Sequence, residues 1–269
     1  SPSLGWRTQA TIGSDKKGRA GFYASRTNTI MAIEDCLVLH PAIGYPKIQS
    51  QHWEPGARIQ VSASTDGSSR LVAGEVIQGE QIQIFTVNGK SYQVSPDSFW
   101  QSNVNAPKVL MDCVKEFADV HAGDHVLDLY GGVGLFALQL HEAVGAGGRI
   151  DLVEGSKSAT ADAAVNFAGK ENVKIYTGDV EKILPRFSRA DVVILDPPRD
   201  GAKKNVIASL VECKPRAIVY VACDPAALAR DSALLRDANY TLEKVRAFDL
   251  FPMTHHIECV ALFTPTAVS

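Results

Sequence analysis

From about residue 105 onward, short apolar runs alternate with helical stretches, and this alternation constrains the fold more than any other feature of the chain. Five apolar runs lie at residues 125–129, 149–153, 173–176, 190–195 and 217–221, and a segment with helical character follows each of them except the third. Strands and helices that alternate in this way form a parallel, doubly wound α/β sheet. We expect a further helix before the first run and two more strands after the last, at residues 106–120, 240–248 and 257–263.

The first 95 residues have a different pattern, with many turn formers between short alternating apolar runs. Residues 81–87 and 91–94 flank Asn88-Gly89, a dipeptide typical of a two-residue hairpin turn. The stretch at residues 13–21 predicts an exposed basic hairpin tip with Lys16, Lys17 and Arg19. We therefore predict a small, mostly antiparallel β-rich domain at residues 1–95, followed by an α/β domain at residues 96–269.

Composition places the chain among soluble globular proteins, with 45% hydrophobic and 21% charged residues. No apolar run approaches the ~18–20 residues that span a bilayer, and the first residues do not resemble a signal peptide. The chain does not begin with Met, so we expect it to be a piece of a longer protein. Five scattered cysteines argue against a disulfide framework and for a reducing cytoplasm.

The net charge of −3 does not identify a polyanion-binding protein, but the charge is uneven along the chain. Residues 1–95 contain nine Lys/Arg and seven Asp/Glu, a balance of +2, and the remainder has a balance of −5. A basic bias in the first part is compatible with nucleic-acid contact, and equally with two solvated surfaces of slightly different charge.

Polar residues follow the predicted strands at the points where those strands end. They are Asp128, Glu154, Asp179, Asp196 and Cys223. In doubly wound sheets, ligands bind outside the carboxyl ends of the strands, where such residues meet. Their position alone therefore predicts a ligand site at this edge of the sheet.

The segment Asp128-Leu-Tyr-Gly-Gly-Val-Gly134 predicts a nucleoside cofactor at that site. Glycines such as Gly131 let the backbone turn sharply and approach a ligand. Glu154, at the end of the next strand, is placed to accept both hydroxyls of an adenosine ribose, and Asp179 to bond the adenine amino group. A dinucleotide site requires a third glycine that is missing here, and Asp128 suits a cationic ligand. These features favour S-adenosylmethionine, the alternative being a glycine-rich turn with solvated carboxylates.

Asp196-Pro-Pro-Arg199 resembles the motif with which aminomethyltransferases hold an exocyclic amine, but Arg199 replaces the motif's aromatic residue. This replacement argues against amine methylation. Cys223 ends an apolar strand and precedes Asp224-Pro225, so the field of the following helix favours its thiolate, whereas Asp224 opposes it. We interpret Cys223 as a nucleophile, the alternative being a small buried apolar residue. The other cysteines have no such placement, and Cys113, Cys213 and Cys259 are interpreted as structural.

Glu258 lies within the last apolar strand, where a carboxylate is costly to bury without a partner or a purpose. His255 and His256 immediately precede it. Two adjacent histidines in a strand would point to opposite faces, so we expect no metal site.

The sequence resembles the RNA 5-methyluridine methyltransferases, and in particular the 23S rRNA uridine-C5 enzymes. The similarity covers residues 96–263 and is weaker over residues 4–40. It rests on Phe99-Trp-Gln-Ser-Asn103, Asp128-Leu-Tyr-Gly-Gly-Val-Gly134, Val153-Glu-Gly155, Leu195-Asp-Pro-Pro-Arg-Asp-Gly201, Val219-Tyr-Val-Ala-Cys-Asp-Pro225, Ala229-Arg-Asp231 and Asp249-Leu-Phe-Pro-Met-Thr-His-His-Ile-Glu258.

The resemblance implies a Rossmann-like methyltransferase domain, preceded by a β-rich central domain that contacts RNA, in a monomeric enzyme. It implies that S-adenosylmethionine is held by Gln101, Tyr130, Glu154 and Asp196. It further implies that Cys223 is the nucleophile, that Glu258 is the base, and that Phe99 stacks near a flipped uridine of an RNA, rRNA rather than tRNA.

Cys36 matches one ligand of the iron–sulfur cluster that some members carry. The other three ligands would lie upstream, as would a small RNA-binding β-barrel, so we expect no cluster in this chain. Two other functions stay open. One is a methyltransferase of a small molecule or an amine that uses no covalent catalysis, and the other is a non-catalytic RNA- or cofactor-binding module.

Overall fold

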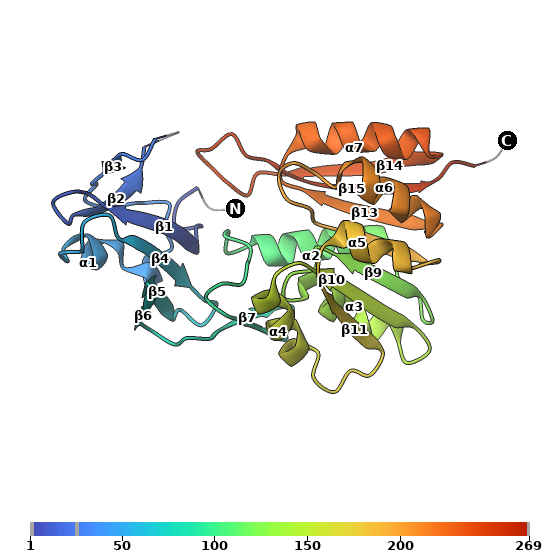
Figure 1. The fold of residues 1–269 in the computed structure, drawn as a ribbon, viewed down its shortest axis with the longest axis horizontal. Coiled ribbons are helices and arrows are strands. Elements are labelled where there is room, and N and C mark those ends of the chain that lie inside the picture. The colour runs from blue at the N-terminus through green and yellow to red at the C-terminus, as the bar shows by residue number, and fades with distance from the viewer. Residues whose placement is uncertain (1–2, 25–26, 268–269) are drawn as a thin grey trace.

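The computed structural model describes residues 3–24 and 27–267, which form two parts joined through residues 79–105 (Figure 1). The first part is a six-stranded, antiparallel sheet in the order β3-β2-β1-β4-β5-β6, which confirms the β-rich prediction. Its elements are β1 (Gln9–Ser14), β2 (Ala20–Tyr23), β3 (Ile30–Met31), η1 (Pro41–Ile43), α1 (Tyr45–Gln49), β4 (Arg58–Ala63), β5 (Ser69–Ala73) and β6 (Glu75–Gln78).

The predicted hairpin tip lies between β1 and β2, where Ser14 pairs with Ala20. Lys16, Lys17 and Arg19 are exposed there, as the sequence predicted.

The second part is built around a seven-stranded sheet in the order β11-β10-β9-β12-β13-β15-β14. The doubly wound, Rossmann-like α/β fold is therefore confirmed. Its strands are β9 (His125–Leu129), β10 (Arg149–Glu154), β11 (Val173–Thr177), β12 (Val192–Leu195), β13 (Ala217–Ala222), β14 (Tyr240–Phe248) and β15 (Glu258–Pro265). Its helices are α2 (Ala106–Ala118), α3 (Leu135–Val144), α4 (Lys157–Asn166), α5 (Val180–Ile183), η2 (Leu184–Arg186), α6 (Lys203–Glu212) and α7 (Pro225–Asp237).

One strand departs from the all-parallel prediction, because β15 lies between β13 and β14 and is antiparallel to both. A parallel connection needs a crossover of a dozen or more residues, usually a helix. Residues 249–257, which join β14 to β15, contain no helix, so the chain folds straight back. The sheet is therefore mixed.

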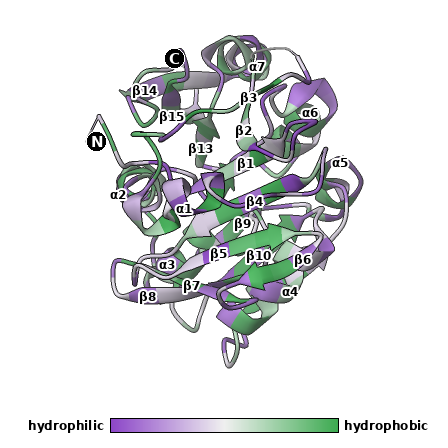
Figure 2. Ribbon diagram, turned by 90° about the vertical axis from the view of Figure 1, so that its left-hand side faces the viewer, coloured by the Kyte–Doolittle hydropathy of each residue, from purple (hydrophilic) through white to green (hydrophobic). Residues whose placement is uncertain are grey.

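The helices cover both faces of this sheet and leave its central strands buried. Figure 2 shows β9 and β10 as hydrophobic, which fits strands that are shielded on two faces. One apolar cluster joins the sheet to α2, α3 and α4, and a second joins its other face to α5, α6 and α7. The carboxyl ends of the strands are thereby fixed relative to one another.

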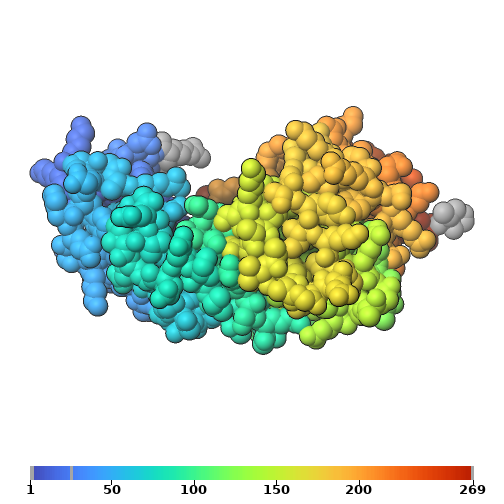
Figure 3. Space-filling model, turned by 60° about the horizontal axis from the view of Figure 1, so that its bottom comes forward, coloured from blue at the N-terminus to red at the C-terminus, as the bar shows by residue number. Residues whose placement is uncertain are grey.

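The hairpin of β7 (Gln83–Val87) and β8 (Lys90–Val94) confirms the Asn88-Gly89 turn, because both turn residues have positive φ, 47° and 77°. The hairpin packs on the second part: Phe85 and Tyr92 lie with their ring centroids 4.9 and 5.2 Å from that of Trp100. We propose a two-domain organisation with the boundary at residue 95, across which this hairpin docks. Figure 3 shows the two lobes, with a notch between them.

Within the described residues, no helix is both long and apolar enough to cross a membrane.

Candidate active site

Cys223 and Glu258 are brought together by the antiparallel pairing of β13 and β15. Ala222 pairs with Cys259, so Glu258, the first residue of β15, lies beside the residue that follows β13. Asp196 follows β12, the other neighbour of β13. The three side chains therefore meet at one edge of the sheet. The strand-end pattern predicted this place for Asp196 and Cys223, whereas Glu258 came from the resemblance alone.

Burial keeps the thiol of Cys223 protonated. Burial, together with the nearby Glu258 and Asp196, raises the pKa of Cys223 to about 11, against the opposing effect of Arg199. Asp224 caps α7 by accepting hydrogen bonds from the backbone N–H groups of Ala226 and Ala227, at 2.8 and 2.9 Å. Burial thus outweighs the effect of the helix field that the sequence suggested.

Glu258 is a carboxyl group poised near neutral pH. Its residue is 5% exposed, and burial raises its pKa to about 7 against an opposing effect of Arg199. Burial also raises the pKa of Asp196 well above its usual range, with further contributions from Glu258 and Asp128. Gln101 Nε2 donates to Asp196 Oδ2 at 3.3 Å and opposes this shift. Such a desolvated group of acids favours a cationic ligand.

The turn after β9 has the tight backbone that its glycines predicted. Gly132 and Gly134 have φ of 55° and 93°, and Tyr130 itself has φ of 59°. A Cβ on Gly131 would lie 2.7 Å from Leu152 Cγ, so the turn sits directly on the sheet.

Asp128 lies behind this turn and not in front of it. It is 1% exposed, and its Oδ2 accepts a hydrogen bond from Ala137 N at 3.0 Å. Its Oδ1 is buried with no hydrogen-bond partner, and burial raises the pKa to about 7. Asp128 therefore lies beside the turn and the start of α3, and its contact with a cofactor stays a prediction.

Glu154 and Asp179 flank the turn at the ends of the next two strands. Glu154 Oε2 accepts from Gly132 N at 3.0 Å, and Oε1 accepts from Ser156 N at 2.7 Å. Each oxygen keeps a second lone pair, so a ribose hydroxyl can still bond there. Asp179 is exposed and caps α5 through Glu181 N at 2.9 Å.

Phe99 is 65% exposed, although its neighbour Trp100 is buried in the core. The segment before Phe99 is tied to the buried carboxylate of Asp162 on α4, which accepts from Ser95 N, Ser95 Oγ and Ser98 Oγ at 2.8, 2.7 and 2.6 Å. Asp162 was missed from the sequence, because an aspartate within a helix carries no local sign that distant donors surround it. An exposed ring on an anchored segment is suited to stacking against a base.

His255 and His256 precede β15 and lie in a loop, so the prediction that they point to opposite faces of a strand was wrong. Their ring centroids are 4.2 Å apart, on the same side of the chain. Among the described residues no group of three or more His, Cys, Asp or Glu side chains could hold a metal ion. Cys113, Cys213 and Cys259 are buried free thiols, as predicted.

A separate cavity of about 230 Å³ lies between the first sheet and the segment that carries Phe99. Its lining includes Arg7 and Arg70 together with Ser62, Ser98 and Ser102. Two guanidinium groups among hydroxyls suit an anion more than a neutral ligand.

Comparison with known proteins places this site within a class. Two relatives named as uncharacterized RNA methyltransferases, from Streptomyces avermitilis and Bifidobacterium longum, are 36% and 35% identical over 97% of this chain. The chain spans about two thirds of their length, 68% and 67%. The fold and these relatives define an RNA methyltransferase.

A family model described as tRNA (Uracil-5-)-methyltransferase matches residues 59–265. The chain therefore belongs to the tRNA (uracil-5-)-methyltransferase family, and the resemblance drawn from its motifs is confirmed.

A solved structure shares the fold across both parts of the chain. It is the Pyrococcus abyssi tRNA (uracil-54, C5)-methyltransferase in complex with S-adenosyl-L-homocysteine, with a TM-score of 0.77 and 21% identity. The similarity covers 98% of this chain and 77% of that protein.

Proposed function

We propose that this chain transfers the methyl group of S-adenosyl-L-methionine to carbon 5 of a uridine in RNA, through a covalent bond between Cys223 and the uracil. The observation that carries this proposal is the meeting of Cys223 with Glu258, a buried carboxyl with a pKa of about 7, at the same edge of the sheet as the glycine turn and Glu154. Family membership supports the same reaction.

The chemistry explains why these residue types are needed. Carbon 5 of uracil is a poor nucleophile. Attack of the Cys223 thiolate on carbon 6 forms a C–S bond and an enolate, whose carbon 5 can accept a methyl group. Glu258 then takes the proton from carbon 5, and elimination breaks the C–S bond and restores the thiolate. The products are 5-methyluridine and the demethylated cofactor, a neutral thioether. The protein returns to its starting state once Glu258 has released the proton to water.

The residues present fit S-adenosyl-L-methionine, which supplies an electrophilic methyl group on a cationic sulfur. The acids around the site fit that positive charge, and it would favour the Cys223 thiolate by the same attraction. Glu154 has free lone pairs for the ribose, and Gly131 and Tyr130 shape the turn on which the nucleoside lies. We propose the same role for Asp179 toward adenine and for Gln101 and Asp196 beside the methionine part. Asp128 contributes through the turn that it supports.

Replacing Glu154 by Ala should weaken binding of S-adenosyl-L-methionine about 10- to 100-fold, because hydrogen bonds to a charged group contribute about 1.5–3 kcal/mol. Isothermal titration calorimetry measures this, with the exposed Glu171→Ala as the matched control. Tighter binding of NAD than of S-adenosyl-L-methionine by the unmodified protein would contradict the assignment of the cofactor.

The breakdown of the methylated adduct should speed up as pH rises through about 7, the pKa of Glu258, and level off above it. A base acts only in its deprotonated form. Because the pKa of Glu258 is raised, its carboxyl stays protonated up to neutral pH, and adduct breakdown speeds up as that proton is lost. Quenched-flow measurement of adduct decay between pH 5.5 and about 8.5 checks this. A flat profile would assign the proton transfer to another group.

The RNA contacts are proposed from Phe99 and from residues 1–95. A target uridine must leave its stack to reach Cys223, at a cost of a few kcal/mol when it is paired, so single-stranded loops are better substrates. Phe99 would stack near the flipped base, and the cavity with Arg7 and Arg70 fits a phosphate of the same strand. On the resemblance we propose rRNA as the substrate, a monomeric enzyme and a cytoplasmic location.

Incubation with RNA that contains 5-fluorouridine tests the proposed function directly. In this RNA, carbon 5 carries fluorine in place of hydrogen, so a base has no proton to remove there and the C–S bond is not broken by elimination. The covalent mechanism therefore leaves a stable protein–RNA adduct. Absence of any adduct with cofactor present would overturn the covalent route. Mapping 5-methyluridine in total RNA with and without the gene then decides between rRNA and tRNA.

A further inference from the structure

Asp231 belongs to the Ala229-Arg-Asp231 motif, to which the proposed reaction gives no role. It lies in the middle of α7 and is 0% exposed. A carboxylate that is fully removed from water is costly unless several donors satisfy it. The groups that donate hydrogen bonds to Asp231 therefore show which parts of the fold it connects.

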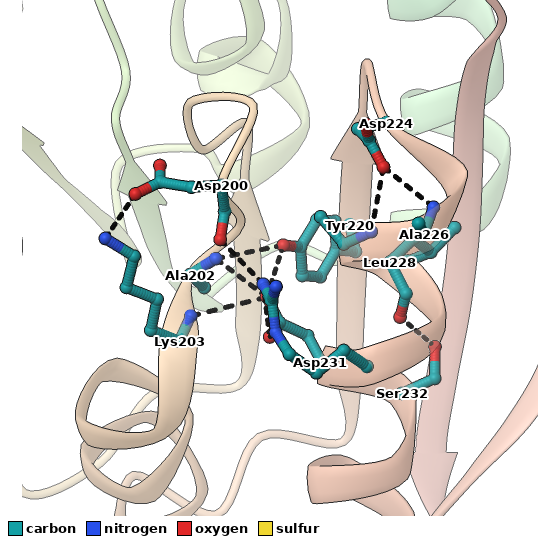
Figure 4. A network of polar contacts seen from close by, with 11 residues as sticks. Asp200, Ala202, Lys203, Tyr220, Asp224, Ala226, Leu228, Asp231 and Ser232 are labelled. Carbon is teal, nitrogen blue, oxygen red and sulfur yellow. Dashed lines mark hydrogen bonds and ion pairs between the residues drawn. The ribbon is translucent and has the colours of Figure 1, made fainter.

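Those donors come from two other elements (Figure 4). Asp231 Oδ2 accepts from Ala202 N at 2.7 Å and Lys203 N at 3.3 Å, where the loop after β12 enters α6. It also accepts from the hydroxyl of Tyr220 on β13 at 2.7 Å, and that hydroxyl accepts from Ala202 N at 3.1 Å. Asp231 thus joins α7, β13 and the loop at residues 196–201.

Arg230 closes the same junction from the outside. It contacts Asp231 Oδ1 at 3.3 Å and donates to the carbonyl of Asp200 at 2.6 Å. Gly201, with φ of 77°, passes so close that an added Cβ would lie 2.5 Å from Asp231 Oδ2. The loop is therefore packed directly against the carboxylate.

The position of this loop decides where Arg199 lies. At its start, Asp196 N donates to Leu129 O at 3.3 Å, and Pro197 and Pro198 restrict the backbone that follows. Its far end is held by Asp231. Between them lies Arg199, an exposed residue of the loop that follows β12, the strand beside β13. Its charge acts to lower the pKa of Cys223, Glu258, Asp224 and His256.

We propose that Asp231 is a positioning residue, which locks the loop at residues 196–201 onto the junction between β13 and α7 and so holds Arg199 at the edge of the sheet where Cys223 and Glu258 meet. It touches neither substrate nor cofactor. The proposal rests on the proposed function, because it assigns Asp231 to the geometry of that reaction.

The first arm of the test needs no RNA. In Asp231→Asn, hydrogen exchange at the amides of Ala202 and Lys203 should become faster, because both N–H groups lose a charged acceptor. Asp237→Asn is the matched control, since Asp237 is on the same helix and also pairs with the preceding arginine but is exposed. Unchanged amide exchange in Asp231→Asn would contradict the proposal that Asp231 holds the loop at residues 196–201 in place.

The second arm measures methyl transfer. Asp231→Asn should lower kcat about 10- to 100-fold, as for a small misplacement of catalytic groups, with the affinity for S-adenosyl-L-methionine unchanged. In the background of Arg199→Ala the same substitution should cause little further loss, because Asp231 acts through that arginine. Independent, additive losses would overturn the positioning role, and so would faster exchange without a change in kcat.

Tyr220→Phe provides a second variant if Asp231→Asn does not fold. It removes one hydroxyl and keeps the ring, so it should give the same changes with a smaller amplitude. If the unmodified protein forms no adduct with 5-fluorouridine RNA, the proposed function fails. The amide exchange still decides whether Asp231 holds the loop at residues 196–201.

Discussion

Replacement of Cys223 by Ala should abolish methylation and adduct formation while binding of S-adenosyl-L-methionine stays nearly intact. The loss of rate should be about 10⁴-fold or more, because the enolate cannot form without the C–S bond. Cofactor binding is preserved because Glu154 and the glycine turn lie on β9 and β10, away from the end of β13. The readout is transfer of a labelled methyl group, together with calorimetry of the cofactor.

Cys36→Ala is the matched control for this variant, since Cys36 is the other half-buried cysteine among the described residues. It should keep both methyl transfer and adduct formation. If Cys223→Ala retained more than a small fraction of the unmodified turnover, the covalent mechanism would be wrong.

Replacement of Glu258 by Gln should block a late step and spare the early ones. Thiolate attack and methyl transfer need Cys223 and the cofactor, so the variant should accumulate RNA that is both methylated and covalently bound, even with ordinary uridine. Decay of this species should be about 10²- to 10⁴-fold slower, the usual contribution of a general base. Denaturing gel electrophoresis with a labelled methyl donor detects it as a slowly migrating band.

The control for Glu258 is Glu243→Gln, an exposed glutamate on the neighbouring strand β14. It should turn over normally and leave no adduct. A Glu258→Gln protein that is inactive but forms no labelled adduct would remove Glu258 from the role of base, and would fit a structural role in which all steps slow alike.

The sequence allowed the edge of the sheet that carries the site to be predicted, because each strand could be recognised by its apolar run and its terminal polar residue. Asp196 and Cys223 therefore lie where the pattern placed them. The direction of β15 could not be predicted, because an apolar run reads the same in a parallel and an antiparallel strand. The contact between Glu258 and Cys223 depends on that direction, so from sequence it rested on the resemblance alone.

Other features were hidden because they depend on contacts between distant segments. Asp162 and Asp231 are polar residues in helices, and nothing nearby in sequence shows that both are buried among donors from other elements. From the sequence, the pKa of the Cys223 thiol depended on two opposing effects, the field of the following helix and the carboxylate of Asp224. The fold adds burial and the nearby Glu258, which both raise that pKa. The chemical groups of the site could be identified from the sequence, whereas the burial that shifts their pKa values could not.

Because Ala222 pairs with Cys259, the distance between Cys223 and Glu258 depends on the register between β13 and β15. Because successive side chains of a strand point to opposite faces, a slip of one residue in β15 would turn Glu258 away from the thiol and bring Ile257 or Cys259 into its place. Insertions in residues 249–257 leave that register untouched, whereas a single insertion after Glu258 would not. The loop can therefore change in length without shifting Glu258 relative to Cys223 along the two strands.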